Sequence, residues 1–298
     1  MTSEDPRDVL PLFRAARSLR SDSCSTRRRA YRGALGVAAN ALTLRERWIH
    51  LRDLLRELVV RDIKLRYKGS ILGQAWTLLN PLAELLVLLF VFSAILPLGI
   101  ANYPAFLFTG LLVYGWFQTS LYNAAGVIVN NRELIRRPGV PSAILPIATV
   151  GSTLIHFLFS LPILFALLVI NHVPITNAVL ALPLLIAVQF TLILAFAYPL
   201  ATLHVWFRDT QYLLRVGLQL LFYLTPVFYE VSVIPARYQT FYRFNPMVPI
   251  VEAYRDLLLR GRLPDPGPLV VLSVLSAAML TAGIVVFRHT SYRFVDEL

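Results

Sequence analysis

The chain has 298 residues, of which 57% are hydrophobic and only 15% are charged. Soluble domains carry about 25% charged and about 45–50% apolar residues, so this composition excludes an ordinary soluble globule. A mean hydropathy of +0.63 excludes a disordered chain as well, and a protein with several membrane-spanning segments is the class that remains.

The basic residues are concentrated near the start of the chain. Of the 28 Lys+Arg that produce a net charge of +11, 16 lie before residue 73. Membrane topology explains this clustering better than nucleic-acid binding does, so no nucleic-acid partner is expected. Cys24 is the single cysteine, which excludes a disulfide within the chain and, in an Arg-rich tail, indicates the reducing cytoplasmic side.

Residues 1–45 are interpreted as a basic cytoplasmic tail. Acidic residues interrupt it and an apolar core is missing, so it is not a cleaved signal peptide. Residues 46–72 then show leucines on one face of a helix and charged residues largely opposite, which predicts an amphipathic helix in the membrane interface. Asp62 falls within the apolar face, so this face should contact protein as well as lipid. The alternative is a helix packed on a soluble core.

Residues 73–290 form the expected transmembrane domain, followed by a cytoplasmic C-terminus at 291–298. Six apolar segments approach or exceed the roughly 20 residues that a helix needs to cross a bilayer. They are Trp76–Ile100, Pro104–Val129, Ser142–Ile170, Ala178–Phe207, Tyr212–Tyr229 and Pro268–Phe287. The predicted class is therefore an all-α integral membrane protein with six spans, the fifth being short and containing Arg215.

The charges of the connecting segments predict the orientation. In this layout 23 of the 28 Lys+Arg fall on the side of the N-terminus, and the turns at 99–103 and 171–177 contain none. Both termini are therefore expected in the cytoplasm, with the multi-pass protein in the plasma (inner) membrane.

The segment between spans five and six is more than a loop. Apolar residues from Ile250 to Leu258 recur at helical spacing, and Pro235–Tyr242 precedes them as a second candidate helix. Both are too short to span, which indicates two short re-entrant helices. Glu252/Arg255 and Asp256/Arg260 are possible same-face pairs.

Catalytic and energy-coupling motifs are scarce. The two lysines, Lys64 and Lys68, do not follow a glycine-rich phosphate loop, so ATP and magnesium would belong to a partner subunit. No catalytic residue, metal site or cofactor is predicted in this chain. His204 and Asp209 have the HxxxxD spacing of lipid acyltransferases, which keeps an integral-membrane enzyme of lipid-linked glycan metabolism as the alternative. Glu84 is either a carboxylate facing a pore or one that reaches back to the interface.

Four stretches resemble one family and occur in its order. They are VRDIKLRYKGSILGQAWTLLNP at 60–81, NNRELIRRPGVPSAILP at 130–146, VWFRDTQYLLRVGLQLLFYLTPVFY at 205–229 and NPMVPIVEAYRDLLL at 245–259. They are similar to ABC-2 type permeases that export O-antigen, teichoic acid or lipid-linked galactan chains. Glu84, where an apolar residue is expected, and the long basic tail depart from the family pattern.

The resemblance implies a homodimer that works with two copies of a cytoplasmic ABC ATPase. A coupling helix would lie between spans two and three, with Glu133, Leu134, Arg136 and Arg137 facing the ATPase. It also implies a lipid-linked polysaccharide as substrate, for which the excess of 26 Arg over 2 Lys, typical of a GC-rich genome, favours a cell-wall galactan.

Three further groups of residues are expected on the substrate path. Arg61, Lys64 and Arg66 would bind an anionic lipid headgroup at the cytoplasmic surface. Aromatic rings suit the apolar faces of sugars, although the same rings could pack against membrane lipids. The expected channel lining is Glu84, Phe90, Tyr114, Phe117 and Phe222. The expected outer gate is Tyr229, Tyr238, Tyr242 and Tyr254.

Overall fold

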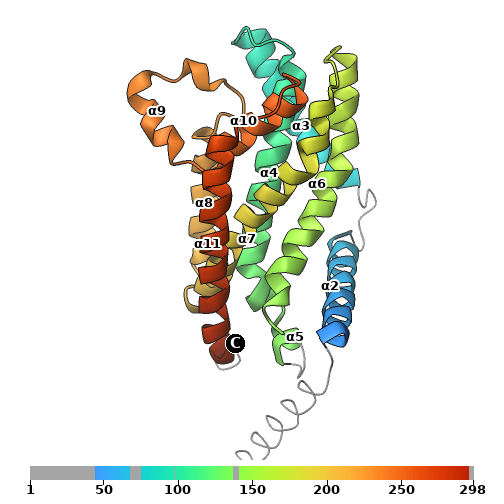
Figure 1. The fold of residues 1–298 in the computed structure, drawn as a ribbon, viewed down its shortest axis with the longest axis vertical. Helices are drawn as coiled ribbons and strands as arrows, with labels where there is room; N and C mark the ends of the chain where they lie inside the picture. Colours follow the sequence, from blue (N-terminus) through green and yellow to red (C-terminus); the bar gives the residue numbers. More distant parts are fainter. Residues whose placement is uncertain (1–43, 68–74, 97, 137–140, 295–298) are drawn as a thin grey trace, which may run out of the picture. The chain divides into compact units, whose positions relative to one another are not determined.

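The computed structural model describes residues 44–67, 75–96, 98–136 and 141–294, and all regular elements in this part of the chain are helices (Figure 1). The all-α class expected from the sequence is thus confirmed. The helices are α2 (Leu44–Tyr67), α3 (Trp76–Phe90), α4 (Tyr103–Asn130), α5 (Arg132–Arg136), α6 (Ile144–Ile170), α7 (Leu182–Trp206), α8 (Thr210–Tyr223), α9 (Ala236–Arg243), α10 (Met247–Leu258) and α11 (Pro266–Thr290).

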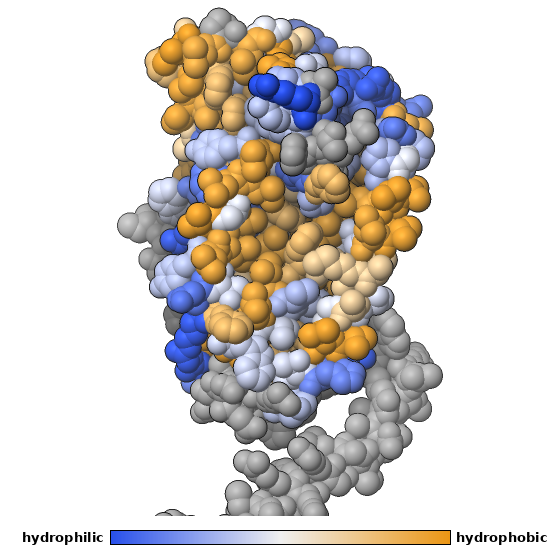
Figure 2. Space-filling model, turned by 90° about the vertical axis from the view of Figure 1, so that its left-hand side faces the viewer, coloured by the Kyte–Doolittle hydropathy of each residue, from blue (hydrophilic) through white to orange (hydrophobic). Residues whose placement is uncertain are grey.

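Four of the described helical segments are long and apolar enough to cross a membrane. They are Leu78–Ile95, Ile144–Ile170, Asn177–Trp206 and Pro266–Thr290, which correspond to the predicted spans one, three, four and six. Figure 2 shows a broad hydrophobic band across the middle of one face, with more hydrophilic residues toward both ends. The protein therefore crosses the membrane several times.

The second and fifth predicted spans differ from these four. α8 has only 14 residues, and α4 has 28 but is less apolar. The composition of α4 follows from its position, because it packs against α3, α6, α7, α8 and α10. Most of its side chains are buried in protein, so the lipid phase does not select for a uniformly apolar surface.

Two polar contacts link α4 to neighbouring helices. The hydroxyls of Ser120 and Thr153 on α6 lie 2.6 Å apart, and the side-chain amide of Gln189 on α7 donates to the Val113 carbonyl at 2.9 Å. Buried polar groups need such partners where water is excluded. α4 is therefore fixed between α6 and α7 by hydrogen bonds as well as by packing.

α2 crosses the boundary between two compact units, residues 1–54 and 55–298. In the first unit, the described residues show an exposed ion pair between Arg52 and Asp53. In the second, Leu58 is buried, and Asp62 accepts a hydrogen bond of 2.5 Å from the Ser152 hydroxyl on α6. The expectation that the face of Asp62 contacts protein is confirmed.

The two short helices expected between spans five and six are confirmed as α9 and α10. In Figure 1 they lie at the end of the bundle opposite to α5. The predicted pairs also form: Arg255 donates to Glu252 at 3.0 Å and Arg260 to Asp256 at 2.7 Å. The spacing of the charges along α10 was thus sufficient to predict these contacts.

Arg255 is buried completely, although it is charged. Its guanidinium donates to Glu252 and, at 2.7 Å, to the carbonyl of Val227, and it lies 3.5 Å from the ring centroid of Phe106 on α4. Burial lowers its pKa to about 10 and the Glu252 carboxylate opposes this shift, so Arg255 remains protonated at neutral pH. This side chain joins α10, the segment after α8, and α4.

A glycine on α4 permits this arrangement. A Cβ atom at Gly110 would lie 2.7 Å from the Val227 carbonyl oxygen and 3.2 Å from a guanidinium nitrogen of Arg255. Neither neighbour can withdraw without losing the hydrogen bond between them. Gly110 therefore allows the segment around Val227 to lie directly against α4.

Replacing Arg255 by Met should lower the free energy of unfolding by about 3 kcal/mol, because it removes one partner of a buried ion pair and leaves the Val227 carbonyl without its donor. Arg262→Met is the matched control. Arg262 pairs with Asp256, but its side chain is 65% exposed, so its replacement should lower the free energy of unfolding by less than about 1 kcal/mol. Unfolding of the purified protein in detergent measures both, and equal losses would contradict the role given to Arg255.

Gly110→Ala should destabilise the protein by about 1–3 kcal/mol, the usual cost of overpacking. Gly115→Ala on the same helix is the control, since a Cβ there meets nothing within 4 Å and alanine favours the helix. The same unfolding measurement compares them. A Gly110→Ala protein as stable as Gly115→Ala would show that the Val227 segment is not fixed by this contact.

Candidate functional site

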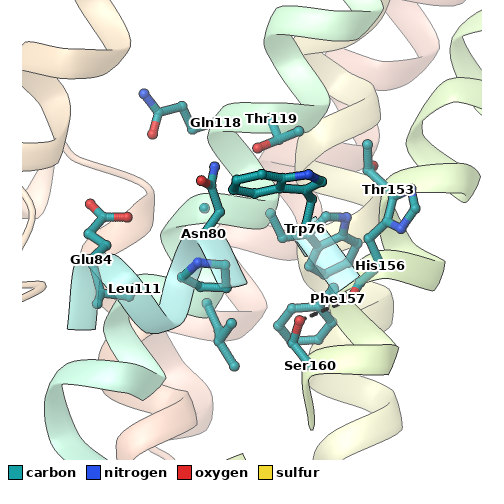
Figure 3. Close-up of a pocket in the computed structure, with 14 residues that line it drawn as sticks. Trp76, Asn80, Glu84, Leu111, Gln118, Thr119, Thr153, His156, Phe157 and Ser160 are labelled. Carbon is teal, nitrogen blue, oxygen red and sulfur yellow. Dashed lines mark hydrogen bonds between the residues drawn. The ribbon is translucent and has the colours of Figure 1, made fainter. Parts of the chain in front are cut away.

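A cavity of about 530 Å³ lies between α3, α4 and α6. Figure 3 shows its side chains directed toward a common space from all three helices. The polar members of the lining are Asn80, Glu84, Gln118, Thr119, Thr153, His156 and Ser160. A cavity with so many polar groups is unusual within helices that are otherwise apolar.

Helical spacing explains why these residues meet. Trp76, Asn80 and Glu84 follow each other at intervals of four, so they share one face of α3. On α6, residues from Thr153 to Ser160 recur at intervals of three and four and form a matching face. Each helix therefore contributes one stripe to the cavity and leaves its other faces for packing.

Aromatic rings form part of the wall. Trp116 and Phe157 stack with ring centroids 4.8 Å apart, and Trp76 is about half exposed. Ring faces next to amides and a carboxylate offer both apolar contact and hydrogen bonds. That combination suits a sugar, whose C–H faces stack on rings while its hydroxyls bind polar groups.

The hydrogen-bonding capacity of the cavity is unevenly used. Ser160 donates to the backbone carbonyl of His156 at 3.1 Å (Figure 3), and Thr153 donates to that of Val150. Among the described residues, in contrast, the side chains of Asn80, Glu84 and Gln118 have no hydrogen-bond partner. These three side chains are available for a ligand.

A smaller cavity of about 220 Å³ continues from the first one. It shares Gln118 and Thr119 with it and is further lined by Tyr122, Leu218 and Arg215. The polar groups thus extend from α3 across α4 to α8. We call Asn80, Glu84, Gln118, Thr119, Tyr122 and Arg215 the polar strip. Apart from Glu84, the members of the polar strip were not predicted from the sequence as lining residues. The polar residues that recur within the otherwise apolar segments could have indicated them.

The residues expected to line a channel fall into two groups. Glu84 belongs to the polar strip, and Phe90 on α3 is 65% exposed. Tyr114, Phe117 and Phe222 are buried: Tyr114 donates to the Leu218 carbonyl, and its ring lies 5.4 Å from Phe222 and 6.1 Å from Phe117. Tyr114 and Phe222 thus hold α8 against α4, whereas the ring of Phe117 lies against Phe196 on α7.

The expected coupling segment is a short helix, α5. Glu133 is exposed at its start, Leu134 is half-buried, and Arg136 is its last residue. Arg137 lies outside the described residues. The start of α5 is tied to the bundle, because the Asn131 amide donates to the Val127 carbonyl at 2.8 Å.

The three cations expected at the headgroup site lie along α2. Arg61 donates to the Asn131 side chain at 2.6 Å, so its guanidinium is engaged with protein beside α5. Lys64 is exposed, and Arg66 lies one residue before the end of the helix. The structure thus connects α2 with the α4–α5 junction through Arg61, a contact not foreseen from the sequence.

Two of the four expected gate tyrosines meet. The hydroxyls of Tyr229 and Tyr242 are 2.9 Å apart, and Tyr229 also donates to the Tyr223 carbonyl. Tyr238 is exposed and contacts Arg237, whereas Tyr254 is buried with its ring against Phe157. Tyr254 therefore connects α10 with α6 inside the bundle.

The HxxxxD pair gains no support from the described structure. His204 is buried in the last turn of α7, Asp209 is exposed before α8, and no hydrogen bond links them in this part of the chain. A general base held by an acid would need such a contact.

Comparison with known proteins agrees with the motifs found in the sequence. Residues 53–259 match the ABC-2 type transporter family. The chain is 36% identical over 250 residues to the O-antigen export system permease protein RfbA of Myxococcus xanthus, which covers 83% of this chain and 96% of that protein. It is 30% identical to RfbA of Klebsiella pneumoniae, in an alignment that covers 84% of this chain and 96% of that protein. It is 27% identical to the polysialic acid transport protein KpsM of Escherichia coli, in an alignment that covers 78% of this chain and 91% of that protein. The chain therefore belongs to the ABC-2 type transporter family, as a membrane permease.

Proposed function

We propose that this protein is the membrane-spanning permease of an ATP-driven exporter that moves a lipid-linked polysaccharide across the plasma membrane. The observation that carries the proposal is the alignment with an O-antigen export permease over 96% of that protein's length. A match over nearly the whole relative covers the spans, the coupling segment and the outer helices together. The further similarity to a polysialic acid transporter supports a polysaccharide as the substrate class.

In this proposal two copies of the chain act with two copies of a cytoplasmic ABC ATPase, which binds ATP and magnesium. The absence of a phosphate-binding loop from the sequence supports a separate motor subunit. α5 is the proposed contact, because it is a short helix with exposed charge between two long helices. Its attachment to α2 through Asn131 and Arg61 would let a movement of α5 reach the start of the transmembrane domain.

Six spans with both termini in the cytoplasm are the proposed topology. α4 qualifies by its 28 residues and its protein-shielded surface. α8 covers roughly 21 Å at 1.5 Å per residue, and the apolar residues that follow it extend this length toward the outer surface. The distribution of basic residues supports the orientation.

The polar strip is the proposed path of the glycan. Its exposed members would face the same surface of a second copy, so that the dimer encloses a route with ring faces and hydrogen-bonding groups. Phe90 and Glu84 would line it directly, and the buried rings of Tyr114, Phe117 and Phe222 would support its wall. Tyr229 and Tyr242 would close the outer end, and Lys64, Arg66 and Arg61 would receive the headgroup at the cytoplasmic surface.

Single-cysteine labelling tests the topology. In a Cys24→Ser background, a cysteine at Ser232 should react with a membrane-impermeant maleimide in intact cells, because Ser232 is exposed beside α9. A cysteine at Arg288, exposed at the end of α11, should react only after permeabilisation. The opposite labelling pattern would invert the proposed orientation.

Charge reversal tests the proposed motor contact. Arg136→Glu together with Arg137→Glu should remove most of the ATPase subunit during co-purification and abolish substrate-stimulated ATP hydrolysis, since paired guanidinium groups bind carboxylates strongly. The double variant Arg208→Glu and Arg288→Glu is the control, because both arginines are exposed and lie outside α5. Full ATPase recovery and normal stimulation in the first variant would contradict the proposal.

A further inference from the structure

Arg215 is an arginine within a helix whose surroundings are apolar. It is exposed in the second turn of α8, with Gln211 and Gln219 one turn away on the same face and the exposed hydrophobic residues Leu213 and Val216 beside it. In the proposed topology it belongs to span five and lies roughly 8 Å along the axis from the cytoplasmic start of the helix. An ionised side chain within a proposed span is rare and by default indicates a functional site.

The guanidinium of Arg215 is held in one orientation. One of its nitrogens donates to the Tyr122 hydroxyl at 2.8 Å, and its carbon lies 5.0 Å from the centroid of the same ring. A hydrogen bond and a cation–π contact to one side chain fix a planar group better than either does alone. The guanidinium is therefore preorganised, and its other N–H donors bond to no further residue in the described part of the chain.

No anion accompanies this cation in the described part of the chain. Arg255, Arg260 and Arg262 each pair with a carboxylate, whereas no carboxylate lies within ion-pair distance of Arg215 among the described residues. The group instead faces the smaller cavity of the polar strip, where the amide of Gln118 and the hydroxyl of Thr119 are further hydrogen-bonding groups. The cavity thus combines a fixed cation with neutral polar groups and has room for an anion.

We propose that Arg215, positioned by Tyr122, binds the phosphate or pyrophosphate group of the lipid-linked substrate as it enters the polar strip. Arginine suits this role because its fork binds phosphate oxygens with two parallel hydrogen bonds. The neighbouring apolar surface of α8 lets the lipid chain remain in the membrane. This inference rests on the proposed function, and it assigns the headgroup a second position beyond the surface cations of α2.

The test uses the complex of permease and ATPase in lipid nanodiscs with three probes, namely a polyprenyl pyrophosphate, the corresponding polyprenol and inorganic pyrophosphate. The wild-type complex should bind the polyprenyl pyrophosphate more tightly than either of the others. Arg215→Gln should weaken this binding about tenfold, and Arg215→Lys less, because a lysine keeps the charge but loses the fork. Tyr122→Phe should also weaken it, by freeing the guanidinium.

Arg208→Gln is the matched control, because Arg208 is exposed, lies seven residues earlier and does not line the cavity. It should bind all three probes as the wild type does, and polyprenol binding should be unchanged in every variant. Unchanged affinity of Arg215→Gln for the polyprenyl pyrophosphate would overturn the proposal. Equal, Arg215-dependent affinity for inorganic pyrophosphate would support an anion site but overturn its assignment to a lipid headgroup.

Failure of this inference can be distinguished from failure of the proposed function. If Arg215→Gln slows export while headgroup binding is unchanged, the exporter assignment stands and the anion site is wrong. If the wild-type complex binds no polyprenyl pyrophosphate and its ATP hydrolysis does not respond to it, the substrate class itself is wrong.

Discussion

The buried guanidinium of Arg255 is the contact on which the end of the bundle that carries α9 and α10 depends. A charge at this depth is tolerated because a carboxylate, a backbone carbonyl and a ring face surround it. Since its partners come from α10, from the segment after α8 and from α4, three parts of the chain are placed by one side chain. Gly110 is the steric counterpart, because only a missing side chain leaves space for the contact.

Charged side chains are arranged differently along the polar strip than around Arg255. Around α10, arginines and carboxylates pair with one another. Along the strip, Arg215, Glu84 and the amides lack such partners among the described residues. Polar groups without protein partners are costly inside a membrane protein, and this is why the polar strip is the proposed path of the glycan.

α4 connects these two regions. The first half of α4 contacts the guanidinium of Arg255, and its middle lines both cavities. Its last residues lead into α5 and to Asn131, which accepts a hydrogen bond from Arg61. A helix with so many protein neighbours cannot be uniformly apolar, which is why composition separates it from the four most hydrophobic helices. Its central position would allow a movement of α5, the proposed coupling helix, to reach the proposed substrate path and the segment around Val227.

The sequence by itself determined the helical membrane class, the family, the short helices α5, α9 and α10, and the pairs of Arg255 and Arg260 with their carboxylates. All of these depend on local spacing, composition or linear motifs. Only the tertiary structure decided which rings are buried, that Tyr114 binds α8, and that Arg215 meets Tyr122 from 93 residues away. The physical reason is that a helix apolar on every side carries no periodic signal for the face that meets protein, lipid or a cavity. Those faces are chosen by packing between distant segments.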